Sequence, residues 1–95
     1  MKATCIFRDR MDYPDGAIIE MVIWQVPRPV LGSGHSLKYS LFYGYPGERV
    51  VGYDNERGKG DHRHLGNVED TYLFTSVEAL IADFLADVKR IRGDL

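Results

Sequence analysis

The sequence has little of what several classes of protein require. Cys5 is the only cysteine among 95 residues, so no internal disulfide can form, and we expect a reducing compartment, the cytoplasm. No run approaches the about 18 apolar residues of a membrane span, and no signal peptide opens the chain, so no membrane association is expected. Charge of one sign is not in excess either. The formal net charge is −2, which argues against a protein that simply coats nucleic acid.

What is present is the composition of a folded domain. Hydrophobic residues make up 44% of the chain and charged residues 27%, which is typical of a globular protein with a core. The sequence contains no internal repeat, low-complexity tract or linker to a second domain. Residues 1–95 are therefore expected to form a single domain, near the lower size limit for an independent core.

Two turn signals predict antiparallel hairpins. In Tyr13-Pro14-Asp15-Gly16 the proline fixes φ and the glycine can adopt a positive φ, and Pro46-Gly47 offers the same pair later. Residues 37–45, which lead into the second turn, alternate apolar and polar side chains like a strand with one buried face. The predicted strands are residues 3–8, 17–26, 37–45 and 48–53, and a short fifth strand could follow over 71–74.

The C-terminal segment predicts one amphipathic helix. Thr75 and Glu78 have the spacing of a capping box, in which each side chain satisfies an amide of the first turn. Apolar residues then recur at steps of three and four up to Ile91, and Gly93 can end the helix. We therefore predict an α+β fold: an antiparallel sheet of four to five strands, built from two hairpins, with one C-terminal helix packed on one face.

The strand predicted over residues 17–26 is apolar on both faces. Its faces carry Ile19, Met21 and Ile23 on one side and Ile18, Val22 and Trp24 on the other. An antiparallel strand with one solvated face should alternate, so both faces are expected to be covered. One helix is only about 10–12 Å across, about half the width of such a sheet. We therefore predict that a second copy or another protein covers the rest, in a homodimer or a hetero-complex.

Residues 52–64 concentrate the chemically active side chains. We expect them to form a glycine-hinged loop, because neither an amphipathic helix nor an alternating strand fits through the centre of the segment. In an extended stretch, His62 and His64 would point to the same side, about 7 Å apart. Since imidazole titrates near neutrality, the pair can supply a general acid and a general base, each contributing about 10²- to 10⁴-fold in rate.

Basic residues and glycines surround the two histidines. Arg57, Lys59 and Arg63 could stabilise the charge that develops on a phosphoryl oxygen. Gly58 and Gly60 would let the backbone approach a phosphate, although no complete phosphate-loop motif is present. The segment also has no Ser or Cys nucleophile. This set predicts RNA cleavage without a metal or other cofactor, in which the 2′-hydroxyl of the RNA itself attacks.

Other interpretations of the same segment stay open. Asp54 or Asp61 would orient one imidazole in the catalytic interpretation. Either residue, or the distant His35, could instead complete a zinc or copper site with the two histidines, although no spacing specifies which. The loop could also belong to a non-catalytic nucleic-acid- or protein-binding module that only grips phosphate. A phosphoesterase or another nucleotide-acting enzyme is the remaining alternative.

The aromatic residues could form a base-stacking surface or a core. Tyr39, Tyr43 and Tyr45 fall at core spacing, so packing is favoured over stacking on RNA bases. Tyr53 lies at the start of the 52–64 segment and is the tyrosine for which we expect substrate binding. His35 is expected to be a solvated loop residue.

The run from Val51 to His64, which ends in Gly-Lys-Gly-Asp-His-Arg-His, resembles the signature of TumE-type toxins of prokaryotic toxin–antitoxin modules. The stretch Phe74-Thr75-Ser76-Val77-Glu78 and the helix after it are also similar to this family, so that the resemblance covers nearly the whole chain. It implies a small intracellular toxin, neutralised by an antitoxin that carries a helix-turn-helix domain. RNA as the target is inferred from the site residues described above and not from the family. The site residues that the resemblance implies are Asp54, Arg57, Lys59, Asp61, His62, Arg63 and His64.

Overall fold

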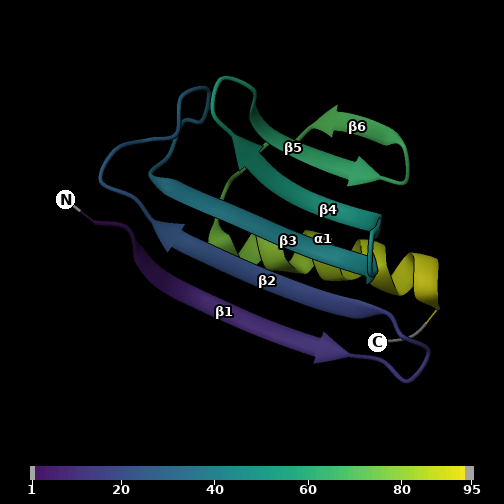
Figure 1. Ribbon diagram of the computed structural model, residues 1–95. Helices are drawn as coiled ribbons and strands as arrows, with labels where there is room; N and C mark the ends of the chain where they lie inside the picture. The colour runs from purple at the N-terminus through teal and green to yellow at the C-terminus, as the bar shows by residue number, and fades with distance from the viewer. Residues whose placement is uncertain (1, 94–95) are drawn as a thin grey trace.

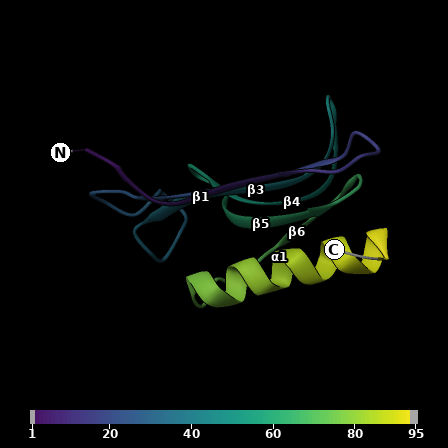
Figure 2. The same cartoon turned by 90° about the horizontal axis from the view of Figure 1, so that it is seen from below.

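In the computed structural model, which describes residues 2–93, six antiparallel strands form one sheet and a helix packs against one of its faces (Figure 1). The elements are β1 (Thr4–Asp12), β2 (Ile18–Gln25), β3 (Leu37–Tyr45), β4 (Glu48–Glu56), β5 (Gly60–Leu65), β6 (Val68–Thr71) and α1 (Val77–Arg92). The strands lie side by side in the order of the sequence. Figure 2 shows α1 beneath the sheet, and no other described element covers the opposite face. The predicted α+β class, antiparallel sheet and C-terminal helix are confirmed.

The predicted count of four to five strands is wrong, because residues 52–64 form a hairpin and not a loop. Strand β4 continues to Glu56 and β5 begins at Gly60, with a tight turn between them. Gly58 and Gly60 have φ angles of 84° and 78°, which glycine adopts far more readily than residues with a side chain. Polar residues lie on both faces of β5, so the apolar–polar alternation that reveals a strand is missing from the sequence.

The last strand was also misplaced. Strand β6 spans Val68–Thr71, whereas the predicted short strand covered residues 71–74. All four residues of β6 are exposed and three of them are polar, so neither burial nor alternation marks them as a strand. Their backbone pairing with β5 is what orders them.

Side chains from the three central strands and the helix form the core. The buried apolar residues are Ala17, Ile19, Met21, Ile23, Tyr39, Leu41, Tyr43, Val51, Tyr53, Leu80, Phe84 and Val88. The expectation that Tyr39 and Tyr43 pack in the core is confirmed, and Tyr45 is half-buried against it. Because side chains alternate across a strand, the residues between these positions point to the face that α1 does not cover, which we call the open face.

Helix α1 is capped one residue later than predicted. Ser76, and not Thr75, is the N-cap: its backbone is extended, and its hydroxyl oxygen accepts a hydrogen bond of 3.0 Å from the N–H of Ala79. Glu78 therefore falls one position short of a capping box. At the other end, Gly93 adopts a φ of 89° and ends the helix as predicted. Within residues 2–93, no helix is long and apolar enough to cross a membrane.

The second apolar face of β2 lies outside the core. Ile18, Val22 and Trp24 belong to the open face, where neighbouring side chains of the sheet leave them half-buried. In the described part of the chain, the expected cover is therefore present on one face of β2 only. Association as a homodimer or a hetero-complex stays a prediction.

Candidate functional site

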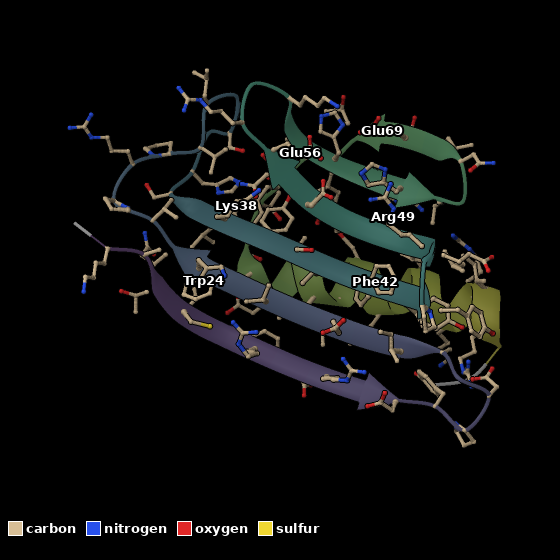
Figure 3. The ribbon with its side chains drawn as sticks, in the orientation of Figure 1. Trp24, Lys38, Phe42, Arg49, Glu56 and Glu69 are labelled. Atoms are coloured by element: carbon tan, nitrogen blue, oxygen red, sulfur yellow. The ribbon has the colours of Figure 1, made fainter. Side chains whose placement is uncertain are left out.

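His62 and His64 lie on the open face of the sheet. Arg63, between them, contacts α1, so the pleat of β5 turns both histidines away from the helix. Their ring centroids are 6.5 Å apart, close to the expected spacing. Across the sheet, the partners of His62 are Asp54 and Thr71, and those of His64 are Gly52 and Glu69. Figure 3 looks onto this face, with Arg49 of β4 and Glu69 of β6 labelled.

Two carboxylates accompany the histidines. Oε2 of Glu69 lies 3.3 Å from Nδ1 of His62 and 3.7 Å from Nε2 of His64, so this carboxylate faces both rings. Oδ1 of Asp54 lies 3.5 Å from Nε2 of His64. The expected proximity of Asp54 to an imidazole is therefore present. Together with Arg49, these four residues form what we call the histidine cluster: Arg49, Asp54, His62, His64 and Glu69.

The contact of His64 with Arg49 fixes the position of the imidazole proton. Nη2 of Arg49 lies 3.0 Å from Nδ1 of His64. A guanidinium can only donate, so Nδ1 must accept and the proton of a neutral ring resides on Nε2. His64 therefore presents its Nε2–H toward the carboxylates of Asp54 and Glu69.

Gly52 makes room for this arrangement. A Cβ atom at Gly52 would lie 2.6 Å from Cδ of Arg49, so the arginine side chain runs across the glycine to reach His64. Gly52 is buried and is the direct cross-strand partner of His64. The absence of a side chain at this position is thus what allows the guanidinium to reach the imidazole.

In His62 the hydrogen-bonded ring nitrogen is Nε2 and not Nδ1. Its Nε2 lies 2.6 Å from the backbone oxygen of Lys59, and because a carbonyl only accepts, Nε2 carries a proton. Nδ1 is then the ring nitrogen without a hydrogen-bond partner, and it faces Glu69. When His62 is neutral, a lone pair on Nδ1 opposes the carboxylate, and when it is protonated the two form an ion pair.

Three polar atoms of the histidine cluster are buried without a hydrogen-bond partner. They are Oδ1 of Asp54, Nδ1 of His62 and Nε2 of His64, counted among residues 2–93. Nearly all buried polar atoms in folded proteins are paired, so unpaired ones mark positions where a ligand, a water molecule or a transferable proton completes the site. Here all three belong to one cluster on an otherwise open face.

Asp61 and His35 lie on the helix side of the sheet and form a structural network. Asp61 accepts hydrogen bonds from Ser33 Oγ at 2.6 Å and from Tyr39 Oη at 2.7 Å, and its Oδ2 lies 2.7 Å from Nε2 of His35. Burial alone would raise the pKa of Asp61, but these hydrogen bonds outweigh it and hold the pKa below its ordinary value. The His35 side chain is only 16% exposed and its ring packs on Phe74, so the expectation of a solvated loop histidine is wrong.

Arg63 and Tyr53 also face the helix. Arg63 donates two hydrogen bonds of 2.9 Å to the two carboxylate oxygens of Asp87 on α1, and Tyr53 donates to the same carboxylate. The hydrogen bond with Asp87 raises the pKa of Arg63. Burial would raise the pKa of Asp87, but hydrogen bonds from Arg63 and Tyr53 lower it overall. The structure therefore separates Arg63, Tyr53 and Asp61 from the two histidines by the thickness of the sheet.

The remaining predicted site residues lie at the β4–β5 turn. Arg57 and Lys59 are exposed, and Nζ of Lys59 lies 3.7 Å from a carboxylate oxygen of Glu56. The N–H of Gly58 donates to the backbone oxygen of Leu31 at 2.6 Å, and a Cβ at Gly60 would lie 2.7 Å from the backbone oxygen of Gly32. The two glycines thus allow the backbone of the turn to lie directly against the connection from β2 to β3.

Sequence reasoning missed Arg49 and Glu69. Both lie outside residues 52–64, and only strand pairing brings them to the histidines. A usable signal for Glu69 was the Gly66-Asn67 turn, which folds the chain back so that Glu69 pairs with His64. Within residues 2–93, no three His, Cys, Asp or Glu side chains are grouped so that they could hold a metal ion.

The fold and the cluster define a small α+β protein that displays acid–base residues on an open sheet face. Comparison with protein families identifies it more closely. The family model described as "Toxin TumE" matches residues 2–92, nearly the whole chain, and the chain belongs to that family. A role as a toxin is therefore supported, and the resemblance noted in the sequence is confirmed. Searches of curated proteins and of solved structures found no match.

Proposed function

We propose that this toxin is a metal-independent endoribonuclease whose reaction takes place at the histidine cluster. The observation that carries the proposal is the convergence of unpaired buried atoms of Asp54, His62 and His64 on the open face. Cleavage of RNA by its own 2′-hydroxyl needs a base, an acid and a donor to the phosphoryl oxygens, and it needs no nucleophile from the protein. The cluster contains one group suited to each of these roles.

His62 and Glu69 suit the two proton transfers. The reaction starts from a protonated His62 and an ionised Glu69, whose Nδ1 and Oε2 atoms lie 3.3 Å apart. Glu69 takes the proton of the 2′-hydroxyl as its oxygen attacks phosphorus, and Nδ1–H of His62 protonates the departing 5′-oxygen as the P–O5′ bond breaks. The products are a 2′,3′-cyclic phosphate and a 5′-hydroxyl. Transfer of the proton from Glu69 to His62 then restores the starting state.

His64 suits the stabilisation of charge on the phosphoryl group. Its Nε2–H is held in the donor state by Arg49, so it can hydrogen-bond a phosphoryl oxygen in the transition state. Asp54 orients the ring from the other side. Arg57 and Lys59, exposed at the adjacent turn, would hold neighbouring phosphates of the RNA. Neutralisation would come from a cognate antitoxin with a helix-turn-helix domain, as the family resemblance implies.

The decisive experiment incubates the purified toxin, without its antitoxin, with a labelled structured RNA in excess EDTA. We expect cleavage to 2′,3′-cyclic phosphate ends, and a loss of at least about 10²-fold in the His62→Ala and the His64→Ala variants. His35→Asn is the matched control, because it removes a histidine–carboxylate pair on the opposite face, and it should cleave like the wild type once its folded fraction is confirmed.

A loss below threefold at both His62 and His64 would refute the assignment of the site. Suppose that the wild type cleaves nothing in EDTA but binds RNA, and that Lys59→Ala weakens this binding. The β4–β5 turn would then bind phosphate without catalysis, and a non-catalytic binding module would replace the ribonuclease as the proposed function. Activity on free nucleotides with none on RNA would instead identify a phosphoesterase.

A further inference from the structure

The open face continues beyond the histidine cluster onto β3 and β2. Ser40 pairs across the sheet with Asp54, which pairs with His62, and Phe42 pairs with Gly52, which pairs with His64. Ser40 and Phe42 thus lie in the same cross-strand rows as the two histidines, two strands or about 10 Å away. Figure 3 shows Phe42 on β3 and, farther along the same face, Trp24 on β2.

A hollow of about 410 Å³ occupies this part of the open face. Phe42 and Val22 supply apolar surface to it, Ser40 supplies an exposed hydroxyl, and Arg8 supplies a cation from β1. Phe42 is half-buried, so its ring is anchored in the sheet while part of it stays accessible. The tyrosines considered for base stacking all face the helix, which leaves Phe42 and Trp24 as the aromatic side chains on the open faces of β2 and β3.

The two arginines at the hollow, Arg8 and Arg10, differ in their ion pairs. Arg10 is held by Asp12 at 3.0 Å and by Glu20 at 3.2 Å. Arg8 lies with its guanidinium 5.7 Å from the centroid of the Trp24 ring, and no carboxylate of residues 2–93 is within ion-pair distance of it. Arg8 therefore offers an uncompensated cation beside the Trp24 ring, in the hollow that Phe42 also lines.

An anchored ring, a hydroxyl and a free cation together are the groups by which sheets bind single-stranded RNA, since every base has a face that stacks and every phosphate attracts a guanidinium. We infer that this hollow binds the nucleotide that flanks the scissile bond of a single-stranded RNA, with its base stacked on Phe42 and its phosphate on Arg8. The inference rests on the proposed function for the position of the scissile bond. It makes the open face one continuous binding surface, from the hollow to the histidine cluster.

The test measures binding separately from cleavage. The probe is a fluorescently labelled single-stranded oligonucleotide of 2′-O-methyl RNA, which has no free 2′-hydroxyl and cannot be cleaved by that route. Phe42→Leu keeps an apolar side chain but removes the stacking face, and it should weaken binding about 5- to 150-fold. Phe42→Tyr should restore most of the affinity. Quenching of Trp24, the single tryptophan, provides a second signal from the wild type.

The matched charge variants are Arg8→Ala and Lys89→Ala. Each removes one exposed cation, but Lys89 lies on α1, on the other side of the sheet. Arg8→Ala should weaken binding and reduce the slope of log affinity against log salt by about 0.7, the value for one phosphate of a single strand. Lys89→Ala should leave both unchanged.

Each outcome decides between the two proposals. If Phe42→Leu and Arg8→Ala bind the oligonucleotide as tightly as the wild type, the nucleotide site is refuted, even if the wild type cleaves RNA. If both variants weaken binding while the wild type cleaves nothing, the nucleotide site stands and the ribonuclease fails. Loss of antitoxin binding with unchanged RNA binding would assign the hollow to a protein contact, which also overturns the inference.

Discussion

Nη2 of Arg49 and Nδ1 of His64 are 3.0 Å apart, and this contact exists because Gly52 has no side chain. Strand β4 carries Arg49 and Gly52, and β5 carries His64. An arginine outside the chemically rich segment thus determines which nitrogen of a histidine inside it holds the proton.

Gly52→Ala should separate this contact from the stability of the fold. The new methyl group would displace the flexible Arg49 side chain, so we expect little change in the free energy of unfolding. Loss of a hydrogen bond from a charged donor should lower RNA cleavage by about 10- to 100-fold. Nitrogen NMR of His64 should then report a mixture of tautomers. Since both changes act through one contact, the double variant Gly52→Ala/Arg49→Ala should cleave no more slowly than Arg49→Ala.

Glu69→Gln tests the proposed base. The substitution keeps the shape of the side chain but removes the negative charge that faces His62 and His64. Single-turnover cleavage should fall by about 10²-fold or more. Asp70→Asn is the control, because Asp70 is the exposed neighbour on β6 and pairs with Arg63, on the other side of the strand. Equal rates for Glu69→Gln and the wild type would leave Glu69 without a catalytic role.

Arg63→Met should affect stability and spare chemistry. It would remove the two hydrogen bonds that Arg63 donates to Asp87, which is 5% exposed, while Arg90 and Tyr53 still donate to that carboxylate. Loss of hydrogen bonds to a charged group costs about 1.5–3 kcal/mol in the free energy of unfolding, measurable by urea denaturation. Cleavage per folded molecule should stay at the wild-type level. If Arg63→Met is as stable as the wild type but has lost activity, the result would instead support the prediction from the sequence that Arg63 binds phosphate.

Asp61 should make the fold sensitive to acid. Hydrogen bonds hold its folded-state pKa below the ordinary value of 3.8, so its contribution is fully present above that value and is lost as the pH falls through the folded-state pKa. In Asp61→Asn, the free energy of unfolding should be lower than in the wild type at pH 7 and should decline less steeply below about pH 4. Urea denaturation over a pH series measures both. Parallel curves for the two proteins would show that Asp61 makes no such contribution.

Local patterns in the sequence were sufficient to predict several features of the structure. The apolar repeat of the C-terminal segment predicts α1, and Gly93 predicts its end, because both depend on contacts within one or two turns of the chain. Turn residues likewise predict the hairpins around Asp15-Gly16 and Pro46-Gly47. The one-residue spacing of His62 and His64 places them on one face of any extended segment. Family membership also follows from the sequence alone.

Which residues share that face depends on contacts between strands and with the helix. The alternation of β5 sends Asp61 and Arg63 to the helix side, where Tyr39 and Asp87 bind them, although both are as polar as the histidines. Strand pairing brings in Arg49 and Glu69, from outside the segment, because contacts across a sheet depend on register and not on distance along the chain. The chemical groups can be read from the residues alone, but strand register and the packing of α1 against one face place Arg49, Asp54, His62, His64 and Glu69 together on the other.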